Sequence, residues 1–375
     1  MANPRGAWIE VDLSAVADNV RALKALTGPK TLFMAVVKAD GYGHGAVEVA
    51  RAALAARADR VGIATIDEGA ELRAAGVEAP IHLLSEPPAI GAQAVVEHRL
   101  TPALYSRDFA IALSRAAMLA QRTVRFHLKV DSGMNRIGVK AEDAPDFVES
   151  LRGLPGLEME GVFTHFATAD VPGDWEFEHQ LERFEATIAE MRERGMDPGI
   201  VHAANSPATI LHPETHFDMV RCGIAIYGLL PSPECAPRVE LRPAMSVKAK
   251  VSRVRRLAMG EGVSYGFTWH APAPTTVATL PLGYADGYRR GLSNKATVLL
   301  GGKACRQVGR VCMDQLMVEV PRGLEVKAGD EAVLVGVQGS ERVTIDEQAA
   351  SCDTINYEIA CGFGLRLERR YPPSR

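Results

Sequence analysis

The chain has 375 residues, of which 47% are hydrophobic and 23% are charged, and its formal net charge is -4 at pH 7. This length predicts one large domain and a smaller one, and the mildly acidic balance excludes a general electrostatic attraction to nucleic acid or to an anionic membrane. The six cysteines form no C-x-x-C pair, the N-terminus lacks the profile of a signal peptide, and no apolar run reaches the roughly 18 residues of a membrane span. We therefore expect a cytoplasmic protein with reduced thiols.

Eight apolar or β-branched runs precede residue 230 and alternate with amphipathic stretches rich in Ala, Glu and Arg. The runs are 31–38 (TLFMAVVK), 59–65 (DRVGIAT), 80–85 (PIHLLS), 99–105 (RLTPALY), 124–131 (VRFHLKVD), 157–165 (LEMEGVFTH), 199–205 (GIVHAAN) and 217–228 (FDMVRCGIAIYG). The pattern predicts helices at 45–57, 106–121 and 175–193. Eight strands with helical crossovers predict a (β/α)8 barrel of parallel strands over residues 13–238.

After residue 240 the long helical patterns disappear, and short Val-, Thr- and Leu-rich runs alternate with Gly and Pro turns. Examples are 246–258 (SVKAKVSRVRRLA), 275–282 (TTVATLPL) and 315–321 (QLMVEVP). This pattern predicts a smaller, mostly antiparallel β domain over 239–375. Segment 1–12 alternates like a strand, and we expect it to pair with this second domain. The best linker candidate is 231–243 (PSPECAPRVELRP).

Reactive side chains follow the predicted barrel strands at the end where the βα loops begin, which is where chemistry collects in this fold. Lys38 ends the first run, Arg136 follows the fifth, and His165 ends the sixth. Ser206 follows the seventh run, and Arg221 lies in the eighth. We therefore predict that these side chains converge at one mouth of the barrel.

Each of these residues also has a purely structural explanation. A lysine at a strand end is usually a surface residue with a buried aliphatic stem, and a lone histidine is more often a hydrogen-bonded structural residue. The arginines could be ion-paired residues of the barrel rim. The stretch 41–46 (GYGHGA) could be a flexible turn, because glycine tolerates backbone angles that other residues resist. Position alone leaves these alternatives open.

Two motifs suggest other chemistry. The glycine-rich turn after the first run, with Asp67 placed for a ribose-binding acid, imitates a dinucleotide-binding fold. Its spacing is G-x-G-x-G, however, and eight strand signals favour the barrel. The stretch 212–216 (HPETH) places two histidines four residues apart, but Pro213 disfavours the regular helix that would bring both rings to one face. We predict a loop there and no metal site.

Nine blocks of the sequence, in order, resemble the motifs of the alanine racemase family, and together they span essentially the whole chain. They are 35–46 (AVVKADGYGHGA), 129–138 (KVDSGMNRIG), 164–170 (THFATAD), 203–208 (AANSPA), 221–228 (RCGIAIYG), 262–266 (GVSYG), 281–288 (PLGYADGY), 309–315 (GRVCMDQ) and 355–362 (INYEIACG). The resemblance implies an isomerase that uses pyridoxal 5'-phosphate to interconvert L-alanine and D-alanine, supplying D-alanine for peptidoglycan.

The resemblance also implies roles for individual residues. Lys38 matches the lysine that binds the cofactor covalently, and Tyr265 matches a second acid/base group on the opposite face, so that inversion uses two bases. Arg221 matches the arginine that donates a hydrogen bond to the pyridine nitrogen, and His165 matches the histidine that orients it. The phosphate-binding positions of the family correspond to Tyr42, Ser206, Gly223, Ile224 and Tyr357.

In this family the tyrosine reaches the active site from a second subunit, so the resemblance implies a homodimer with shared sites. Arg136 and Met313 match substrate-binding positions, and Asp314 lies beside Met313. Tyr284, together with the tyrosine at 357, matches the pair that narrows the access channel. Lys129 matches a position that some members carry as a carbamate.

Three alternatives stay open beside alanine racemization. The first is a racemase with broader amino-acid specificity. The second is a fold-related decarboxylase, which is expected to place a carboxylate where Arg221 stands. The third is a non-enzymatic pyridoxal-phosphate carrier, which is expected to lack the second domain.

Overall fold

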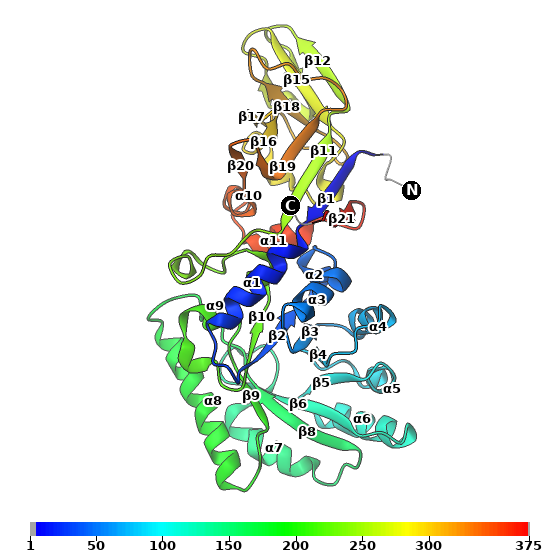
Figure 1. Cartoon of the computed structure of the whole chain (residues 1–375), viewed down its shortest axis with the longest axis vertical. Helices are drawn as coiled ribbons and strands as arrows, with labels where there is room; N and C mark the ends of the chain where they lie inside the picture. The colour runs from blue at the N-terminus through cyan, green and yellow to red at the C-terminus, as the bar shows by residue number, and fades with distance from the viewer. Residues whose placement is uncertain (1–4, 374–375) are drawn as a thin grey trace. The chain divides into compact units, whose positions relative to one another are not determined.

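The structure is a computed structural model that describes residues 5–373 (Figure 1). Within this range the chain forms two compact units. The barrel unit comprises residues 14–41 and 46–243, and the β unit comprises residues 5–13, 42–45 and 244–373. Residues 1–4 of the predicted N-terminal strand segment lie outside the described residues. Over residues 5–373, every helix is too short or too polar to cross a bilayer.

Eight parallel strands form a nearly closed barrel in the order β10-β2-β3-β4-β5-β6-β8-β9, and the short β7 (Val139–Lys140) pairs with β6 (Figure 1). Hydrogen bonds from Asp218 N to Val201 O and from Arg221 N to Ala204 O, each 3.0 Å, link the two ends of this order. The predicted barrel is confirmed. A dinucleotide-binding fold is wrong, because that fold has an open sheet. The eight strands are β2 (Leu32–Val36), β3 (Arg60–Ile63), β4 (Ile81–Leu83), β5 (Leu100–Leu104), β6 (Val124–Asp131), β8 (Leu157–Phe163), β9 (Ile200–His202) and β10 (Met219–Cys222).

Helices connect these strands, and several of them begin at residues whose side chains cap the first turn. Thr65 forms a capping box with Glu68, and the Ser106 hydroxyl accepts a hydrogen bond from Phe109 N at 3.3 Å. Asp174 accepts from Glu176 N at 2.7 Å, which sets the start of α8 at the predicted residue. The helices are α1 (Leu13–Ala25), α2 (Lys38–Tyr42), α3 (Ala46–Ala55), α4 (Ile66–Ala74), α5 (Ala92–Glu97), α6 (Arg107–Leu119), α7 (Ala144–Leu151), α8 (Trp175–Glu193) and α9 (Ser206–Leu211).

The β unit is mostly antiparallel, as predicted, and contains three sheets. The largest has the order β17-β16-β19-β11-β1-β21 with β20 paired to β19, and the others are β12-β15-β18 and β13-β14. Its elements are β1 (Ala7–Val11), β11 (Met245–Lys250), β12 (Arg253–Leu257), β13 (Gly262–Val263), β14 (Trp269–His270), β15 (Thr275–Leu280), β16 (Thr297–Leu300), β17 (Lys303–Arg306), β18 (Leu316–Val320), β19 (Glu331–Gln338), β20 (Glu341–Val343), α10 (Ile345–Ser351), α11 (Asn356–Gly362) and β21 (Glu368–Arg370).

One predicted run of the β unit, 246–258, is two strands in different sheets. Val251 N donates to Asp330 O beside β19, whereas the next residue, Ser252, donates from its N to Thr279 O of β15. The chain therefore leaves the largest sheet at one peptide and joins the second sheet at the next. Apolar periodicity does not reveal such a change of partner, because both strands use the same residue types.

The first described strand, β1, lies inside the largest sheet of the β unit. It pairs antiparallel with β11, from Ala7 opposite Ala249 to Val11 opposite Met245, and parallel with β21. Ile9 and Val11 are fully buried there. Residues from both ends of the described chain therefore build one sheet.

The glycine-rich turn after β2 has a left-handed backbone. The φ angles are 53° at Ala39, 51° at Asp40, 60° at Gly41, 51° at Tyr42 and 80° at Gly43. Left-handed angles cost roughly 1–2 kcal/mol per non-glycine residue. A Cβ at Gly43 would also lie 2.4 Å from Ala360 O. Gly43 is therefore required both by the left-handed backbone of the turn and by the close contact with α11.

Candidate active site

The predicted barrel residues lie at the C-terminal ends of their strands. Lys38 follows β2 and is half-buried, and Lys129 and Arg221 lie on β6 and β10 with only 4% exposure each. His165 follows β8, and the exposed Arg136 lies in the loop after β6. In a parallel barrel these ends share one face.

The Arg221 guanidinium is held by several acceptors inside the barrel unit. Its Nη2 donates to Thr164 O at 2.8 Å and to Ala203 O at 2.9 Å, and it lies 3.2 Å from His165 Nδ1. Its Nη1 lies 3.0 Å from His202 Nδ1. Burial lowers the pKa of Arg221 to about 9, so the guanidinium stays charged at neutral pH. Among residues 5–373, none accepts a hydrogen bond from its Nε.

Positive charge accumulates around Arg221. Burial and then the charge of Arg221 hold the pKa of Lys129 well below its usual value. The Lys129 Nζ donates to Val130 O at 3.2 Å and lies 5.0 Å from the centre of the Phe163 ring. The pKa of His165 is also well below its ordinary value, first because of burial. The cations that add to the shift at His165 are Arg221, Lys129, Arg136 and Lys38. Such a cluster favours an anionic ligand.

Two loops of the barrel unit meet at Ser206, the buried first residue of α9. Asn205 caps this helix by accepting from Ala208 N at 3.1 Å. The Ser206 Oγ accepts a hydrogen bond from Gly223 N at 3.0 Å, which joins the end of β9 to the turn after β10. Ile224, fully buried, begins that turn. Because Oγ accepts from Gly223, the Ser206 hydroxyl hydrogen remains available to donate.

Two predicted tyrosines pack together in the β unit. The rings of Tyr42 and Tyr357 have centroids 6.2 Å apart and are tilted by 54°. Tyr42 is 8% exposed and follows the left-handed turn, whereas Tyr357 is half-buried in α11. The close approach of Gly43 to Ala360 fixes the position of this pair.

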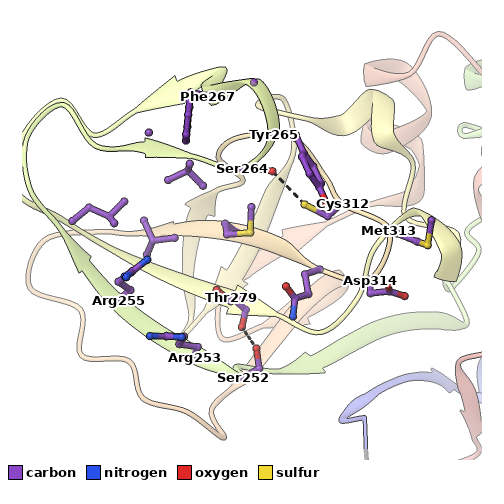
Figure 2. A pocket seen from close by; sticks show the side chains of 17 residues that line it. Ser252, Arg253, Arg255, Ser264, Tyr265, Phe267, Thr279, Cys312, Met313 and Asp314 are labelled. Atoms are coloured by element: carbon purple, nitrogen blue, oxygen red, sulfur yellow. Dashed lines mark hydrogen bonds between the residues drawn. The ribbon is translucent and has the colours of Figure 1, made fainter.

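Three other predicted residues line one pocket of the β unit, of about 900 Å³ (Figure 2). Figure 2 shows the Tyr265 ring beside Cys312, with Met313 and Asp314 following along the chain. Tyr265 is 72% exposed and Met313 is 52% exposed. The turn that carries Tyr265 is held by Ser264, whose Oγ donates to Arg310 O at 2.7 Å. These apolar side chains are therefore presented outward from a fixed backbone.

Backbone hydrogen bonds connect the turn of Tyr284 to the segment that contains Cys312 and Met313. Tyr284 N donates to Cys312 O, and Ala285 N donates to Met313 O, each at 3.0 Å. A Cβ at Gly283 would lie 2.2 Å from Cys312 O, so only glycine fits before this tyrosine. The side chain of Tyr284 is 41% exposed.

Asp314 belongs to an ion-pair network within the β unit. Its carboxylate lies 2.7 Å from Arg366 Nη2 and 3.5 Å from Arg5 Nη2. Arg5 also pairs with the fully buried Asp286, at 2.5 Å. Asp286 accepts from Gly283 N at 2.9 Å and so braces the turn of Tyr284.

The two histidines of the stretch 212–216 (HPETH) contact different backbone carbonyl groups. Pro213–Thr215 form a short 3-10 turn. The His212 Nε2 lies 3.2 Å from Ala169 O, and the His216 Nε2 lies 2.9 Å from Thr209 O.

His202, His127 and Glu160 were not predicted as site residues, although a series of hydrogen bonds connects them to Arg221. The signal was present, because each is a polar residue within a short barrel strand. In such a strand alternate side chains point into the barrel.

Comparisons with known proteins cover nearly the whole chain. Residues 11–231 match the family described as alanine racemase, N-terminal domain, and residues 244–371 match alanine racemase, C-terminal domain. The chain is 49% identical to the alanine racemase of Symbiobacterium thermophilum over 367 residues, which cover 98% of this chain and 97% of that protein.

Solved structures give the same result. The alanine racemase of Bacillus anthracis with bound L-Ala-P superposes with a TM-score of 0.93 at 38% identity, covering 98% of this chain and 95% of that one. The alanine racemase of Bartonella henselae with covalently bound pyridoxal phosphate superposes with a TM-score of 0.85 at 28% identity, covering 98% and 99%.

Proposed function

The chain belongs to the alanine racemase family of pyridoxal-phosphate-dependent isomerases, and from this membership we propose that it binds pyridoxal 5'-phosphate and interconverts L-alanine and D-alanine as a homodimer with shared active sites. The observation that carries the proposal is the division of the predicted site residues. A buried cationic group lies in the barrel unit, and an exposed phenol lies in the β unit.

The residues at the barrel mouth fit the cofactor. Lys38, Arg136 and Arg221 supply more positive charge than the nearby Asp131 offsets, which suits an anionic phosphate and a phenolic oxygen. The Ser206 hydroxyl has a hydrogen to donate, and the Nε of Arg221 can donate a further hydrogen bond. When bound, pyridoxal phosphate acidifies the Cα–H of an amino acid by delocalising the electron pair that remains.

Lys38 has two tasks in this proposal. Its amine attaches the cofactor as a nucleophile, and after release it removes or returns the proton at Cα on one face. Its position supports both tasks, because the left-handed turn is fixed by hydrogen bonds on each side. Ala39 N donates to Glu68 Oε1 at 2.6 Å, and Ala46 N donates to Asp40 Oδ1 at 3.1 Å.

Tyr265 serves the opposite face, because inversion of a stereocentre needs one acid/base group on each side of a planar carbon. We assign this role to the partner's Tyr265. Its 72% exposure beside the half-exposed Met313 supports the assignment. Exposed apolar side chains on a fixed backbone are typical of a surface that another chain covers.

Arg221 is proposed to influence the reaction because its guanidinium does not give up a proton to the cofactor. A buried guanidinium that stays charged at neutral pH donates a hydrogen bond at the ring nitrogen without transferring a proton. Because Arg221 keeps its proton, the bound ring would stay unprotonated and would withdraw electrons less strongly, which would limit misplaced protonation. A decarboxylase is expected to use a carboxylate here, so the arginine disfavours that alternative.

Tyr284 and Tyr357 are proposed to narrow the access channel, which favours a methyl side chain over larger ones. A broader-specificity racemase is distinguished by incubating the purified protein with a panel of L-amino acids and recording optical rotation. Turnover of bulky amino acids as fast as alanine would support the broader enzyme. The six cysteines are free thiols, which is consistent with our proposal that the reaction supplies D-alanine in the cytoplasm for peptidoglycan.

Mixing two inactive variants tests the shared site. In a dimer of one Lys38→Ala chain and one Tyr265→Phe chain, one site carries both changes and the other carries neither. Random reassociation makes roughly half of the dimers mixed, so we expect roughly a quarter of wild-type activity to return. Lys38→Ala mixed with a chain carrying both changes is the matched control and should regain none. No recovery in the first mixture, with mixed dimers verified by mass spectrometry, would show that each site lies within one chain.

A further inference from the structure

A buried series of hydrogen bonds leads from Arg221 through the barrel core to Glu160 on β8. The Arg221 Nη1 lies 3.0 Å from His202 Nδ1, and the His202 Nε2 lies 2.7 Å from His127 Nδ1. The His127 Nε2 lies 3.0 Å from Glu160 Oε2. His127 and His202 are at most 1% exposed. Water therefore does not reach the hydrogen bond between the two histidines.

The two ends of the series fix its direction. A carboxylate only accepts hydrogen bonds, so His127 donates from Nε2 to Glu160. A neutral His127 then accepts at Nδ1 from the Nε2–H of His202. His202 is thereby left with a bare Nδ1, which accepts from Arg221. Burial lowers the pKa values of both histidines, so both are neutral in this arrangement.

Arg60 holds the far end of the series. It donates from Nη1 to Glu160 Oε2 at 2.8 Å and from Nη2 to Glu160 Oε1 at 3.2 Å. Hydrogen bonds from His127 and Arg60 keep the pKa of Glu160 below its ordinary value despite burial. The carboxylate therefore stays charged at the pH where the enzyme works.

A metal ion is a competing interpretation of this cluster, because ligand atoms of His82, His127 and Glu160 all lie within 4.8 Å of one another. The Arg60 Nη1, however, lies 3.0 Å from His82 Nε2 and also donates to Glu160. The guanidinium already uses these lone pairs and would repel a cation. Arg60 therefore supplies the positive charge of this cluster in place of a metal ion.

The backbone makes room for the series. The pairing of β6 with β8 shifts register between Phe126 and His127, and a bulge of this kind re-aims side chains. A Cβ at Gly161 would lie 2.6 Å from the His127 ring. The His127 imidazole therefore fits only because residue 161, next to Glu160, is glycine.

We propose that Glu160 is a positioning residue for the racemase reaction: through His127 and His202 it fixes the direction of the hydrogen bonds that hold the Arg221 guanidinium. This inference rests on the proposed role of Arg221 at the cofactor ring. If the series ran the other way, His202 would present an Nδ1–H to an Nη1–H of Arg221 at 3.0 Å. Two donors would then face each other, and the guanidinium would move away.

Histidine tautomers test the direction without cofactor. In the full chain labelled with ¹⁵N at histidine, long-range ¹H–¹⁵N spectra should show His127 and His202 as neutral rings protonated at Nε2. The single variants His127→Gln and His202→Gln assign the signals. An Nδ1–H tautomer or an imidazolium at His202 would overturn the proposal, whether or not the protein binds pyridoxal phosphate.

Glu160→Leu tests the consequence at the cofactor. We expect about tenfold weaker binding of pyridoxal 5'-phosphate, the scale of one lost hydrogen bond to a charged group, together with a shifted absorption band and a changed His202 tautomer. Glu160→Gln keeps one acceptor and should lose less. Glu158→Leu, on the same strand but 52% exposed in its side chain, is the matched control and should match wild type.

The outcomes separate the two ideas. Thermal unfolding of each variant reports structural damage apart from positioning. Unchanged cofactor affinity, absorption and tautomer in a folded Glu160→Leu chain would refute the positioning role. A wild-type protein that binds no pyridoxal phosphate, with the expected tautomers intact, would instead count against the proposed function.

Discussion

The two units of the chain present their predicted functional residues in opposite ways. In the barrel unit, Lys129, Ser206 and Arg221 are at most 4% exposed, and Ser206 and Arg221 are hydrogen-bonded to neighbouring strands or loops. In the β unit, Tyr265 and Met313 are more than half exposed on a rigid backbone. The first set is buried and hydrogen-bonded within its own unit, whereas the second set is exposed.

Because of this difference, substitutions in the two units should have different effects. Buried, interlocked groups are costly to alter, because the partners left behind lose their hydrogen bonds. Exposed groups contribute little to the stability of their own unit. Substitutions in the barrel should therefore affect folding and chemistry together, whereas Tyr265 should affect chemistry alone.

Lys38→Ala is expected to have the largest effect. It removes the proposed nucleophile and one proposed base, so racemization should fall by about 10³-fold or more. Covalent attachment of the cofactor, measured by mass after borohydride reduction, should vanish. Lys140→Ala, an exposed lysine of the same unit, is the control. Retention of the reduced adduct in the Lys38 variant would contradict the assignment.

Tyr265→Phe should lower turnover by about a hundredfold while leaving the melting temperature unchanged, because the side chain is 72% exposed in its own chain and phenylalanine keeps the aromatic ring. Isotope exchange at Cα should be impaired far more from one enantiomer than from the other. Tyr105→Phe removes a phenol hydroxyl from the barrel unit and serves as control. Equal losses from both enantiomers would argue against two bases on opposite faces.

Two glycine-to-alanine substitutions, one in each unit, allow the effect on the free energy of unfolding to be compared. Gly76→Ala, in the barrel unit, meets open space at a φ of 84° and should cost about 1 kcal/mol. Gly43→Ala, in the β unit, meets Ala360 O at a similar φ of 80° and should cost roughly 2 kcal/mol more. Denaturant midpoints measure both. Equal midpoints would mean that the close approach to α11 does not constrain the turn.

A smaller effect is expected from pH. Burial lowers the pKa values of His82, His127 and His202 below the ordinary 6.5. The unfolded chain then binds more protons than the folded one below pH 6.5, so the free energy of unfolding should decrease as pH falls through that region. His202→Gln should lessen this slope by up to about 1.4 kcal/mol per pH unit. His270→Gln, exposed in the β unit, should not change it.

Much of the fold follows from the sequence. Strand β2 is a continuous apolar run, as expected for a strand covered on both faces, and Asp174 and Ser106 mark the starts of their helices by capping. The β unit was harder to predict in detail. Val251 and Ser252 join different sheets, and nothing in residue type announces that change.

The site was predictable in part. The resemblance identified Arg221, but the hydrogen-bond series from Arg221 to Glu160 depends on which side chains of β6, β8 and β9 face one another inside the barrel. Barrel closure sets those neighbours, and local pattern does not. The left-handed turn likewise needs the contact between Gly43 and Ala360, residues more than 300 positions apart in the sequence.

Strand β1 has a consequence for biosynthesis. Its partners β11 and β21 begin at residues 245 and 368, so the ribosome makes all of the barrel strands between β1 and its first partner. The barrel segments emerge during that interval and can fold first. Deletion of β1 should consequently damage the β unit, and protease-resistant nascent chains released before residue 245 should contain the barrel alone.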